Sequence, residues 1–324
     1  MKTVNYAGYV KRFQSLIALL LLCIVLSLLT DKFLTTENSL NILRQTAVNI
    51  CIATGMTVVV LTAGIDLSVG SILALCGAVA AGLLKNGISL QASDVFIGFT
   101  VFGAVVAGII IGYLIGLFNG FVITKFKVPP FVATLAMLTI ARGLTMLYTH
   151  GQPISNLGPS FDFIGTGSFW GLPVPVWIAA IVVLITVFLM QKTKFGRYVY
   201  AIGGNETAAK FSGINIPKVK ILSYALAGAF AAIAGIIVTS RLDSAQPNAG
   251  TSYELDAIAA VVIGGTSLNG GRGTIWGTVI GAVIIGVLNN GLVLLNVSPF
   301  WQQVVKGSVI LLAVIIDKLG HSKD

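Results

Sequence analysis

The chain has 324 residues, of which 56% are hydrophobic and only 10% are charged. A soluble domain usually carries about 25% charged residues, so this composition excludes a water-soluble globular protein and predicts an all-α polytopic membrane protein. The formal net charge of +9 does not indicate a partner nucleic acid, because the basic residues form no continuous face with interleaved aromatics.

Ten apolar stretches are candidates for crossing ~30 Å of hydrocarbon, which takes roughly 17 to 25 helical residues. The first follows Lys11 and Arg12 and has no small-x-small cleavage site, so we expect a retained helix rather than a signal peptide. The eighth is short and is expected to be a half-span or an interrupted helix, which leaves counts of nine or eleven open. In chain order the stretches are 15–30, 46–63, 67–84, 95–122, 131–148, 175–190, 219–240, 255–268, 275–295 and 300–316.

The positions of the basic residues predict the orientation, because cytoplasmic loops carry an excess of Lys and Arg. With the N-terminus inside, fourteen of the twenty basic residues fall on the inner side, and both termini are cytoplasmic. The fourteen are Lys2, Lys11, Arg12, Lys125, Lys127, Lys192, Lys194, Arg197, Lys210, Lys218, Lys220, Arg272, Lys318 and Lys323.

No linker divides the chain, so we expect one transmembrane domain over residues 1–324. Two polar segments interrupt the apolar pattern: an outer loop at 149–174 and an inner loop at 191–218. The outer loop is rich in Gly, Pro, Ser and Phe, which predicts a structured loop or a short re-entrant piece.

Small residues recur every fourth position in three of the stretches, which predicts close helix–helix packing rather than a substrate site. They are Ala104, Gly108, Gly112, Gly116 and Gly120; Ser223, Ala227, Ala231 and Gly235; and Gly273, Gly277 and Gly281. The segment 60–70 also weakly resembles 261–271. Duplicated halves and chance from glycine-rich composition explain that likeness equally well.

The sequence contains no pattern for catalysis. It has no phosphate-cradling Gly-x-x-x-x-Gly-Lys-Ser/Thr motif, and its three cysteines and two histidines have no metal-ligand spacing. We therefore expect no catalytic residues, no metal and no cofactor in this chain.

Ionisable and amide side chains inside apolar stretches are functional candidates by default. Asp66 is expected to cap a helix or mark a break between two helices, with a proton relay as the alternative. Arg142 is expected to bind a carboxylate or the carbonyls at a helix end. The remaining candidates for a polar path or for interhelical hydrogen bonds are Asn119, Asp256, Asn289, Asn290 and Lys306.

The inner loop contains the sequence Gly203-Gly204-Asn205-Glu206-Thr207-Ala208-Ala209-Lys210-Phe211-Ser212-Gly213. Asn205 is a good N-cap and Glu206 is favourable in a first turn, while Gly213 can end a helix. We expect a capped helix of about two turns with Ala208 and Ala209 on its surface. Such a helix suits docking into a partner, and a simple connector on the membrane surface is the equal alternative.

This inner-loop pattern resembles the cytoplasmic coupling loop of monosaccharide permeases of the ribose type, the membrane subunits of ABC importers. Four more stretches carry the same resemblance, which covers nearly the whole chain from about residue 15 to residue 317. They are 55–71 with Gly-Ile-Asp-Leu-Ser-Val-Gly, 133–143 ending in Arg142-Gly143, 244–260 with Tyr-Glu-Leu-Asp-Ala-Ile-Ala-Ala, and 264–273 with Gly-Gly-Thr-Ser-Leu. One departure is Lys210-Phe211, where the family commonly has Arg-Leu.

The resemblance implies a ten-helix, type II-like permease in the inner membrane of a bacterial cell, paired as a homodimer. It implies a cytoplasmic ATPase subunit with two nucleotide-binding halves, which would hold ATP and Mg, and a periplasmic sugar-binding protein. The expected cargo is ribose or a closely related monosaccharide. The expected ATPase-coupling residues are Gly203, Gly204, Asn205, Glu206, Ala208, Ala209, Lys210 and Gly213.

Three alternatives remain open at this point. Asp66 and Asp256 could serve a proton-coupled secondary sugar transporter, or the bundle could form a channel. A third alternative is an ABC permease for another sugar or for autoinducer-2, because those relatives share the same motifs.

Overall fold

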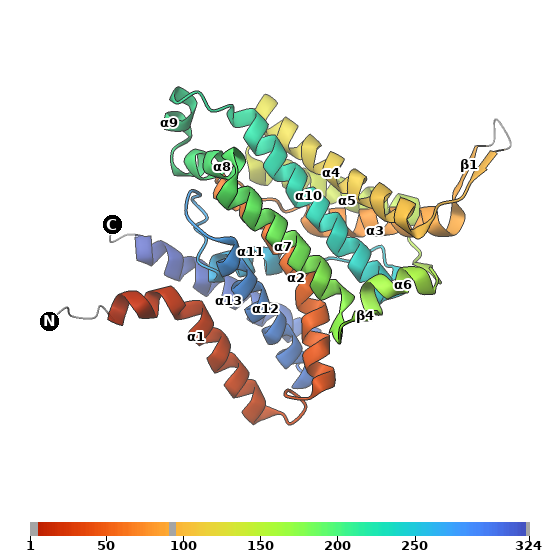
Figure 1. Cartoon of the computed structure of the whole chain (residues 1–324), viewed down its shortest axis with the longest axis horizontal. Coiled ribbons are helices and arrows are strands. Elements are labelled where there is room, and N and C mark those ends of the chain that lie inside the picture. The colour runs from red at the N-terminus through yellow and green to blue at the C-terminus, as the bar shows by residue number, and fades with distance from the viewer. Residues whose placement is uncertain (1–5, 91–94, 322–324) are drawn as a thin grey trace.

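The computed structural model describes residues 6–90 and 95–321. Each of the ten predicted spans overlaps one helix (Figure 1), but the first two helices begin at Tyr6 and Thr36 rather than at 15 and 46, and the eighth ends at Ile263 rather than at 268. These helices are α1 (Tyr6–Leu29), α2 (Thr36–Leu61), α3 (Val69–Asn86), α4 (Val101–Lys125), α5 (Pro130–Thr149), α7 (Val174–Lys192), α10 (Ile216–Arg241), α11 (Tyr253–Ile263), α12 (Ile275–Leu294) and α13 (Pro299–His321).

Among the described residues, seven helices are long and apolar enough to cross a membrane: α2, α3, α4, α5, α7, α10 and α12. The eighth predicted span is short, as expected, because α11 has only 11 residues. The fourth was predicted to begin at residue 95, which is wrong: β2 (Val95–Ile97) occupies that position. Helix α4 begins later because Thr100 caps it by accepting a hydrogen bond from the Gly103 amide.

The predicted outer loop is structured, as its composition indicated. It holds α6 (Pro159–Thr166), β3 (Ile154–Ser155), β4 (Ser168–Phe169) and β5 (Leu172–Pro173). Strand β3 pairs antiparallel with β6 (Ser244–Ala245), and this pairing ties the loop to the end of α10. The other two-stranded ribbons pair β1 (Ile88–Leu90) with β2 and β4 with β5.

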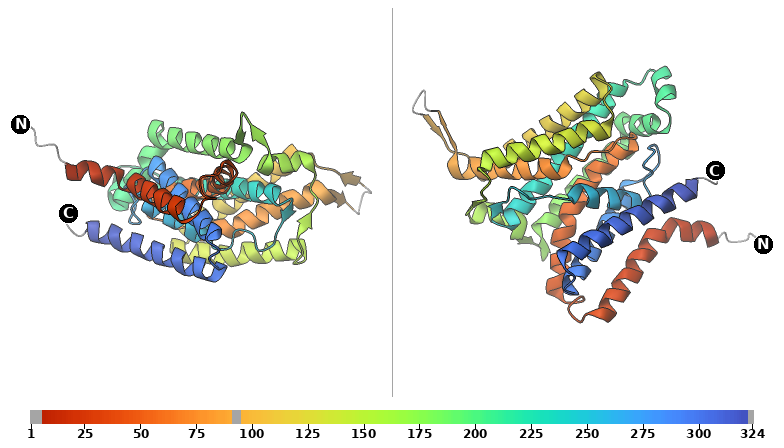
Figure 2. Two further views of the ribbon diagram at one scale, coloured as in Figure 1. Left: turned by 90° about the horizontal axis from the view of Figure 1, so that it is seen from below. Right: turned by 180° about the vertical axis from the view of Figure 1, so that it is seen from behind.

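Helices α2 and α10 form the centre of the bundle. Helix α2 packs against α7, α10, α11 and α12, and α10 packs against α3, α4 and α6 as well (Figure 2). From Thr46 to Leu61 nearly all of α2 is buried, whereas α4, α5 and α7 bury only one stripe each. The exposed faces of those outer helices are apolar, as a lipid-facing surface requires.

The predicted small-residue stripes are buried at helix contacts. On α4, a Cβ added at Gly112 or Gly116 would collide with the Gly228 or Tyr224 carbonyl of α10. These glycines therefore let two backbones approach as closely as main-chain atoms permit. One member was misplaced: Gly273 precedes α12, which begins at Ile275 after its Thr274 cap.

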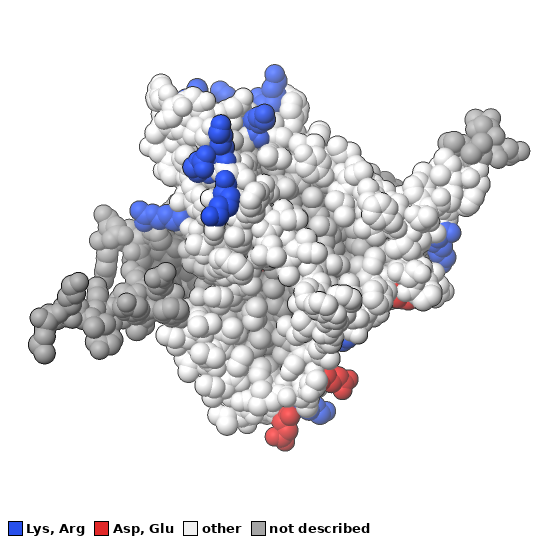
Figure 3. All heavy atoms as spheres, viewed as in Figure 1, with Lys and Arg blue, Asp and Glu red and all other residues white. Residues whose placement is uncertain are grey.

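Basic side chains are concentrated at one end of the molecule (Figure 3). In that view most of the visible Lys and Arg gather over the end that carries α8 (Lys194–Gly204) and α9 (Glu206–Phe211), whereas the visible Asp and Glu lie toward the opposite end together with a few Lys and Arg. The start of α1 and the end of α13 lie on the side of α8 and α9 in Figure 1. Of the basic residues assigned to the inner side, Lys2 and Lys323 lie outside the described residues.

Candidate functional site

The segment singled out in the inner loop folds into two short helices, α8 and α9, joined at Asn205. The Asn205 side chain accepts a hydrogen bond from the Ala208 amide at 2.9 Å, and Glu206 lies in the first turn of α9. This confirms the predicted cap. The sequence did not predict α8, so Gly203 and Gly204 end one helix rather than merely preceding another.

Helix α9 ends where Gly213 was expected to end it. Gly213 has φ +80, and its amide donates to the Lys210 carbonyl at 3.0 Å. The next amide, of Ile214, donates to the Ala209 carbonyl at 3.1 Å. These two bonds form a Schellman motif, in which a residue in left-handed conformation satisfies the last free carbonyls. Both ends of the six-residue helix are thus fixed by local hydrogen bonds.

One expectation for α9 is wrong. Ala208 is exposed, but Ala209 is only 4% exposed and packs in a cluster with Val58, Leu61 and Ile202. A helix this short has one face against the bundle, and Ala209 lies on that face. The free face carries Ala208, Lys210 and Phe211, whose ring is 86% exposed.

Gly203 is the point where α8 touches the helical bundle. A Cβ added there would collide with the carbonyl oxygen of Leu61, the last residue of α2, and with the amide of Gly271. That Gly271 amide itself donates to the Leu61 carbonyl at 3.0 Å. Sequence analysis did not foresee this junction, although the Gly270-Gly271 pair was a signal for close backbone approach.

A second bond strengthens the same junction. The Tyr200 hydroxyl of α8 donates to the Gly273 carbonyl at 2.9 Å. Helix α8 therefore contacts both the end of α2 and the loop between α11 and α12.

The two segments with weak internal similarity meet here. Helix α2 ends in a Schellman motif with Ala63 at φ 59, and α11 ends in the same motif with Gly265 at φ 82. In this geometry Ala63 corresponds to Gly265, whereas the sequence match paired Ala63 with Gly264. The similarity is a shared helix ending, displaced by one residue from the sequence alignment.

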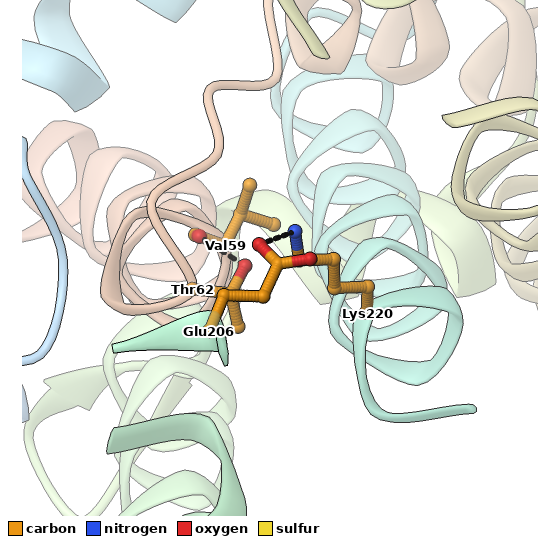
Figure 4. Close-up of polar contacts among 4 residues, drawn as sticks. All are labelled: Val59, Thr62, Glu206 and Lys220. Carbon is orange, nitrogen blue, oxygen red and sulfur yellow. Dashed lines mark hydrogen bonds and ion pairs between the residues drawn. The ribbon is translucent and has the colours of Figure 1, made fainter. Parts of the chain in front are cut away.

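An ion pair holds α9 to α10. The Lys220 ammonium and the Glu206 carboxylate are 2.7 Å apart, with Lys220 largely buried and Glu206 half exposed (Figure 4). The same figure shows the end of α2, where the Thr62 hydroxyl donates to the Val59 carbonyl at 2.7 Å. A pair with one half-exposed partner adds little stability, but it links the first turn of α9 to the first turns of α10.

Asp66 lies at the break between α2 and α3, as the prediction of a helix cap or helix break required. Its carboxylate accepts hydrogen bonds from the amide and the hydroxyl of Ser68, at 2.9 and 2.5 Å. Asn119 of α4 donates to the Ser68 hydroxyl at 2.9 Å. All three side chains are buried, so this cluster ties α4 to the helix break.

Arg142 binds backbone carbonyls, as expected. Its guanidinium donates to the carbonyls of Pro247 and Ala249 at 2.6 and 2.9 Å. These carbonyls belong to the stretch that leads into α11, so Arg142 links α5 to the start of the short helix.

Asp256, Asn289 and Lys306 come together from three helices. The Lys306 ammonium of α13 lies 2.9 Å from the Asp256 carboxylate of α11, and Asn289 of α12 donates to the same oxygen at 3.3 Å. Asp256 is buried, while the Lys306 side chain is 23% exposed. Asn290 is directed elsewhere: it exchanges two hydrogen bonds with Asn38 of α2.

The candidate polar residues thus form separate groups rather than one site. Asp66 with Asn119, Arg142, Asp256 with Asn289 and Lys306, and Asn290 each join a different set of elements. In the part of the chain that the structure describes, no three His, Cys, Asp or Glu residues are grouped as metal ligands.

Comparison with known proteins gives consistent matches. The family described as "Branched-chain amino acid transport system / permease component" matches residues 38–314. The chain is 52% identical to the ribose import permease protein RbsC of Bacillus subtilis, over 98% of this chain and 96% of that protein. No solved structure matches.

Two further relatives carry the same name. The RbsC protein of Haemophilus influenzae is 50% identical over 96% of this chain and 94% of its own length. That of Escherichia coli K12 is 52% identical over 94% of this chain and 92% of its own length.

Proposed function

Because this chain belongs to the ribose import permease family of ABC importers, we propose that it moves ribose or a closely related monosaccharide from the periplasm into the cytoplasm. Members of this family are transport subunits rather than enzymes, so a separate ATPase subunit supplies the energy. That subunit binds ATP and Mg, and this chain needs no cofactor of its own.

The coupling site for that ATPase is the α8–α9 segment. Its residues are Gly203, Gly204, Asn205, Glu206, Ala208, Ala209, Lys210 and Gly213. The observation that supports this assignment is the junction at Gly203, where α8 meets the end of α2 and the loop after α11. A force applied to the exposed face of α9 reaches the centre of the bundle through main-chain contacts, which cannot yield as side chains do.

The complete transporter contains two copies of this chain, an ATPase with two nucleotide-binding halves and a periplasmic sugar-binding protein. The whole chain, 1–324, forms one transmembrane domain in the bacterial inner membrane. Ten helices enter the bilayer and both termini are cytoplasmic, with the coupling loop 191–218 inside and the loop 149–174 outside. The gathering of Lys and Arg at the α8–α9 end supports this orientation (Figure 3).

The transport step is a shift between inward-open and outward-open bundles, and ATP binding favours one of them. Asp256 and Asn289 are the pathway candidates we favour, since their partner Lys306 remains partly exposed. The other polar candidates form hydrogen bonds between elements that must move together; they are Asp66, Asn119, Arg142 and Asn290.

Two substitutions on the free side of the coupling segment test this assignment. Gly204 has open space around it and Ala208 is exposed, so Gly204→Trp and Ala208→Arg leave the bundle intact while they block docking. Sugar uptake and sugar-stimulated ATP hydrolysis by the assembled transporter are expected to fall at least ten-fold. The control is Asn86→Arg, at an exposed position on the last turn of α3. Normal uptake and ATP hydrolysis in both coupling variants contradict the assignment.

A further inference from the structure

A basic groove beside α9 shares Glu206 and Lys210 with the proposed coupling segment and extends beyond that segment to the α4–α5 turn. A groove of about 400 Å³ lies between the α4–α5 turn and the start of α10. Its charged lining is Lys127, Lys210, Lys220 and Glu206. We propose that this groove binds the phosphate headgroup of an anionic phospholipid.

The charge balance of the groove favours an anion. Lys220 is neutralised by Glu206 at 2.7 Å. Lys127 and Lys210 are both exposed and form no ion pair with any residue of the described chain. The lining therefore presents two uncompensated ammonium groups. Each Lys near a lipid surface contributes roughly 1 kcal/mol to the attraction of anionic headgroups.

The position of the groove favours a lipid over a soluble anion. Its walls are the last turn of α4 and the first turns of α5 and α10, three helices that are long and apolar enough to cross a membrane. The ends of such helices are expected at the headgroup layer of a bilayer. On the two sides of the α4–α5 turn, Phe126 is 65% exposed and Phe131 is 54% exposed. Along α4, Phe118 and Phe121 continue this apolar surface, at 52% and 45% exposed. A headgroup in the groove leaves its acyl chains against these rings.

The groove is also stiff enough to be a formed site. Pro129 and Pro130 fix the backbone of one wall, because proline rings lock φ, and Pro217 lies in the opposite wall. Lys127 adopts a left-handed conformation, with φ 54, in the turn between α4 and α5. Its side chain is thus presented by a defined turn rather than by a free loop.

The test uses the full chain purified in neutral detergent and titrated with phosphatidylglycerol, with phosphatidylcholine and inorganic phosphate as separate arms. We expect phosphatidylglycerol to raise Tm in a saturable way, while the other two have little effect. Lys127→Gln is expected to raise the half-saturating lipid concentration about five-fold, the equivalent of one Lys at a lipid surface. Lys127→Arg is expected to keep the wild-type affinity.

The matched control is Lys125→Gln, on an exposed lysine two residues away that does not line the groove. Where Lys127→Gln fails to fold, Lys210→Gln provides the same comparison. Equal stabilisation by phosphatidylcholine or by inorganic phosphate overturns the proposal, as does unchanged lipid affinity in Lys127→Gln. If Lys127→Gln weakens association with the ATPase subunit and leaves lipid affinity unchanged, the groove is a protein-docking site instead.

Discussion

Gly203 at the end of α8 lies directly against Leu61 at the end of α2, so closely that a Cβ at Gly203 would collide with the Leu61 carbonyl oxygen. Gly204, the next residue, has open space around it. Gly203 and Gly204 therefore have different structural roles. Gly203 permits a main-chain contact with the bundle, whereas Gly204 leaves the outer surface of the segment free.

This difference gives the first prediction. Gly203→Ala is expected to lower the free energy of unfolding by about 1–3 kcal/mol, the usual cost of overpacking a close contact, and to reduce transport. Gly204→Ala is expected to change neither by a measurable amount. The measurements are the thermal stability of both purified variants and sugar uptake by the transporters that contain them. Equal effects at the two positions would show that the Gly203–Leu61 contact is not the tight one.

The N-cap of α9 gives a second prediction. Asn205→Ala removes the hydrogen bond to the Ala208 amide, and losing such a cap destabilises a helix by about 1 kcal/mol. Because α9 has only six residues, we expect it to fray and sugar-stimulated ATP hydrolysis to fall several-fold.

A matched control is present in the same loop. Asn215 caps α10 in the same way, accepting from the Lys218 amide at 3.1 Å. Helix α10 is long and buried, so Asn215→Ala should leave coupling near normal, and Asn205→Ser should restore it. Full activity in Asn205→Ala would contradict a coupling role for an intact α9.

The partly buried pair of Asp256 and Lys306 gives a third prediction. Lys306→Met leaves the buried Asp256 carboxylate without its cation. Because Lys306 is 23% exposed, the expected destabilisation lies below the roughly 3–5 kcal/mol typical of fully buried pairs, at about 2 kcal/mol. The double variant Asp256→Asn/Lys306→Met removes both charges and is expected to recover most of that loss in thermal stability. A double variant no more stable than Lys306→Met would mean that the two charges do not interact.

A fourth prediction concerns pH and the outer loop. Burial raises the pKa of the Asp162 carboxyl on α6 above its usual range, and the neighbouring Asp243 carboxylate raises it further. The pKa of this carboxyl is therefore lower in the unfolded chain than in the folded chain. Between these two pKa values the folded chain holds more protons, so the free energy of unfolding falls as pH rises.

Asp162→Asn should remove this part of the pH dependence, so that Tm changes less across the mildly acidic range. The control Asp31→Asn alters an exposed carboxylate at the turn between α1 and α2. Tm measured as a function of pH for the three proteins gives the answer. An unchanged pH profile in Asp162→Asn would rule out this carboxyl as the source.

Much of the fold followed from the sequence, because membrane helices and caps are set by local pattern. Ten apolar stretches became ten helices, and Asn205 and Gly213 bound α9 as their types predict. The side of α9 that is buried was misjudged at Ala209, because only its distant partners Val58 and Leu61 determine it. The Gly203 junction escaped prediction for the same reason.

The interior charges show a similar limit. Asp66 at a helix break is an arrangement that neighbouring residues suggest. For Arg142 the sequence predicted the type of partner, a carbonyl, but not which carbonyls, because Pro247 and Ala249 lie far along the chain. The pairing of Asp256 with Lys306 joins helices α11 and α13, and periodicity contains no information on which interior charges meet.

The most direct test of the account is uptake of labelled ribose into proteoliposomes that contain this chain, its ATPase subunit and its periplasmic sugar-binding protein. We predict uptake that requires ATP, does not respond to a proton gradient alone, and is lost in Ala208→Arg while the complex still contains folded permease. Uptake driven by a proton gradient without ATP, or ATP-dependent uptake unchanged in Ala208→Arg, would contradict the account.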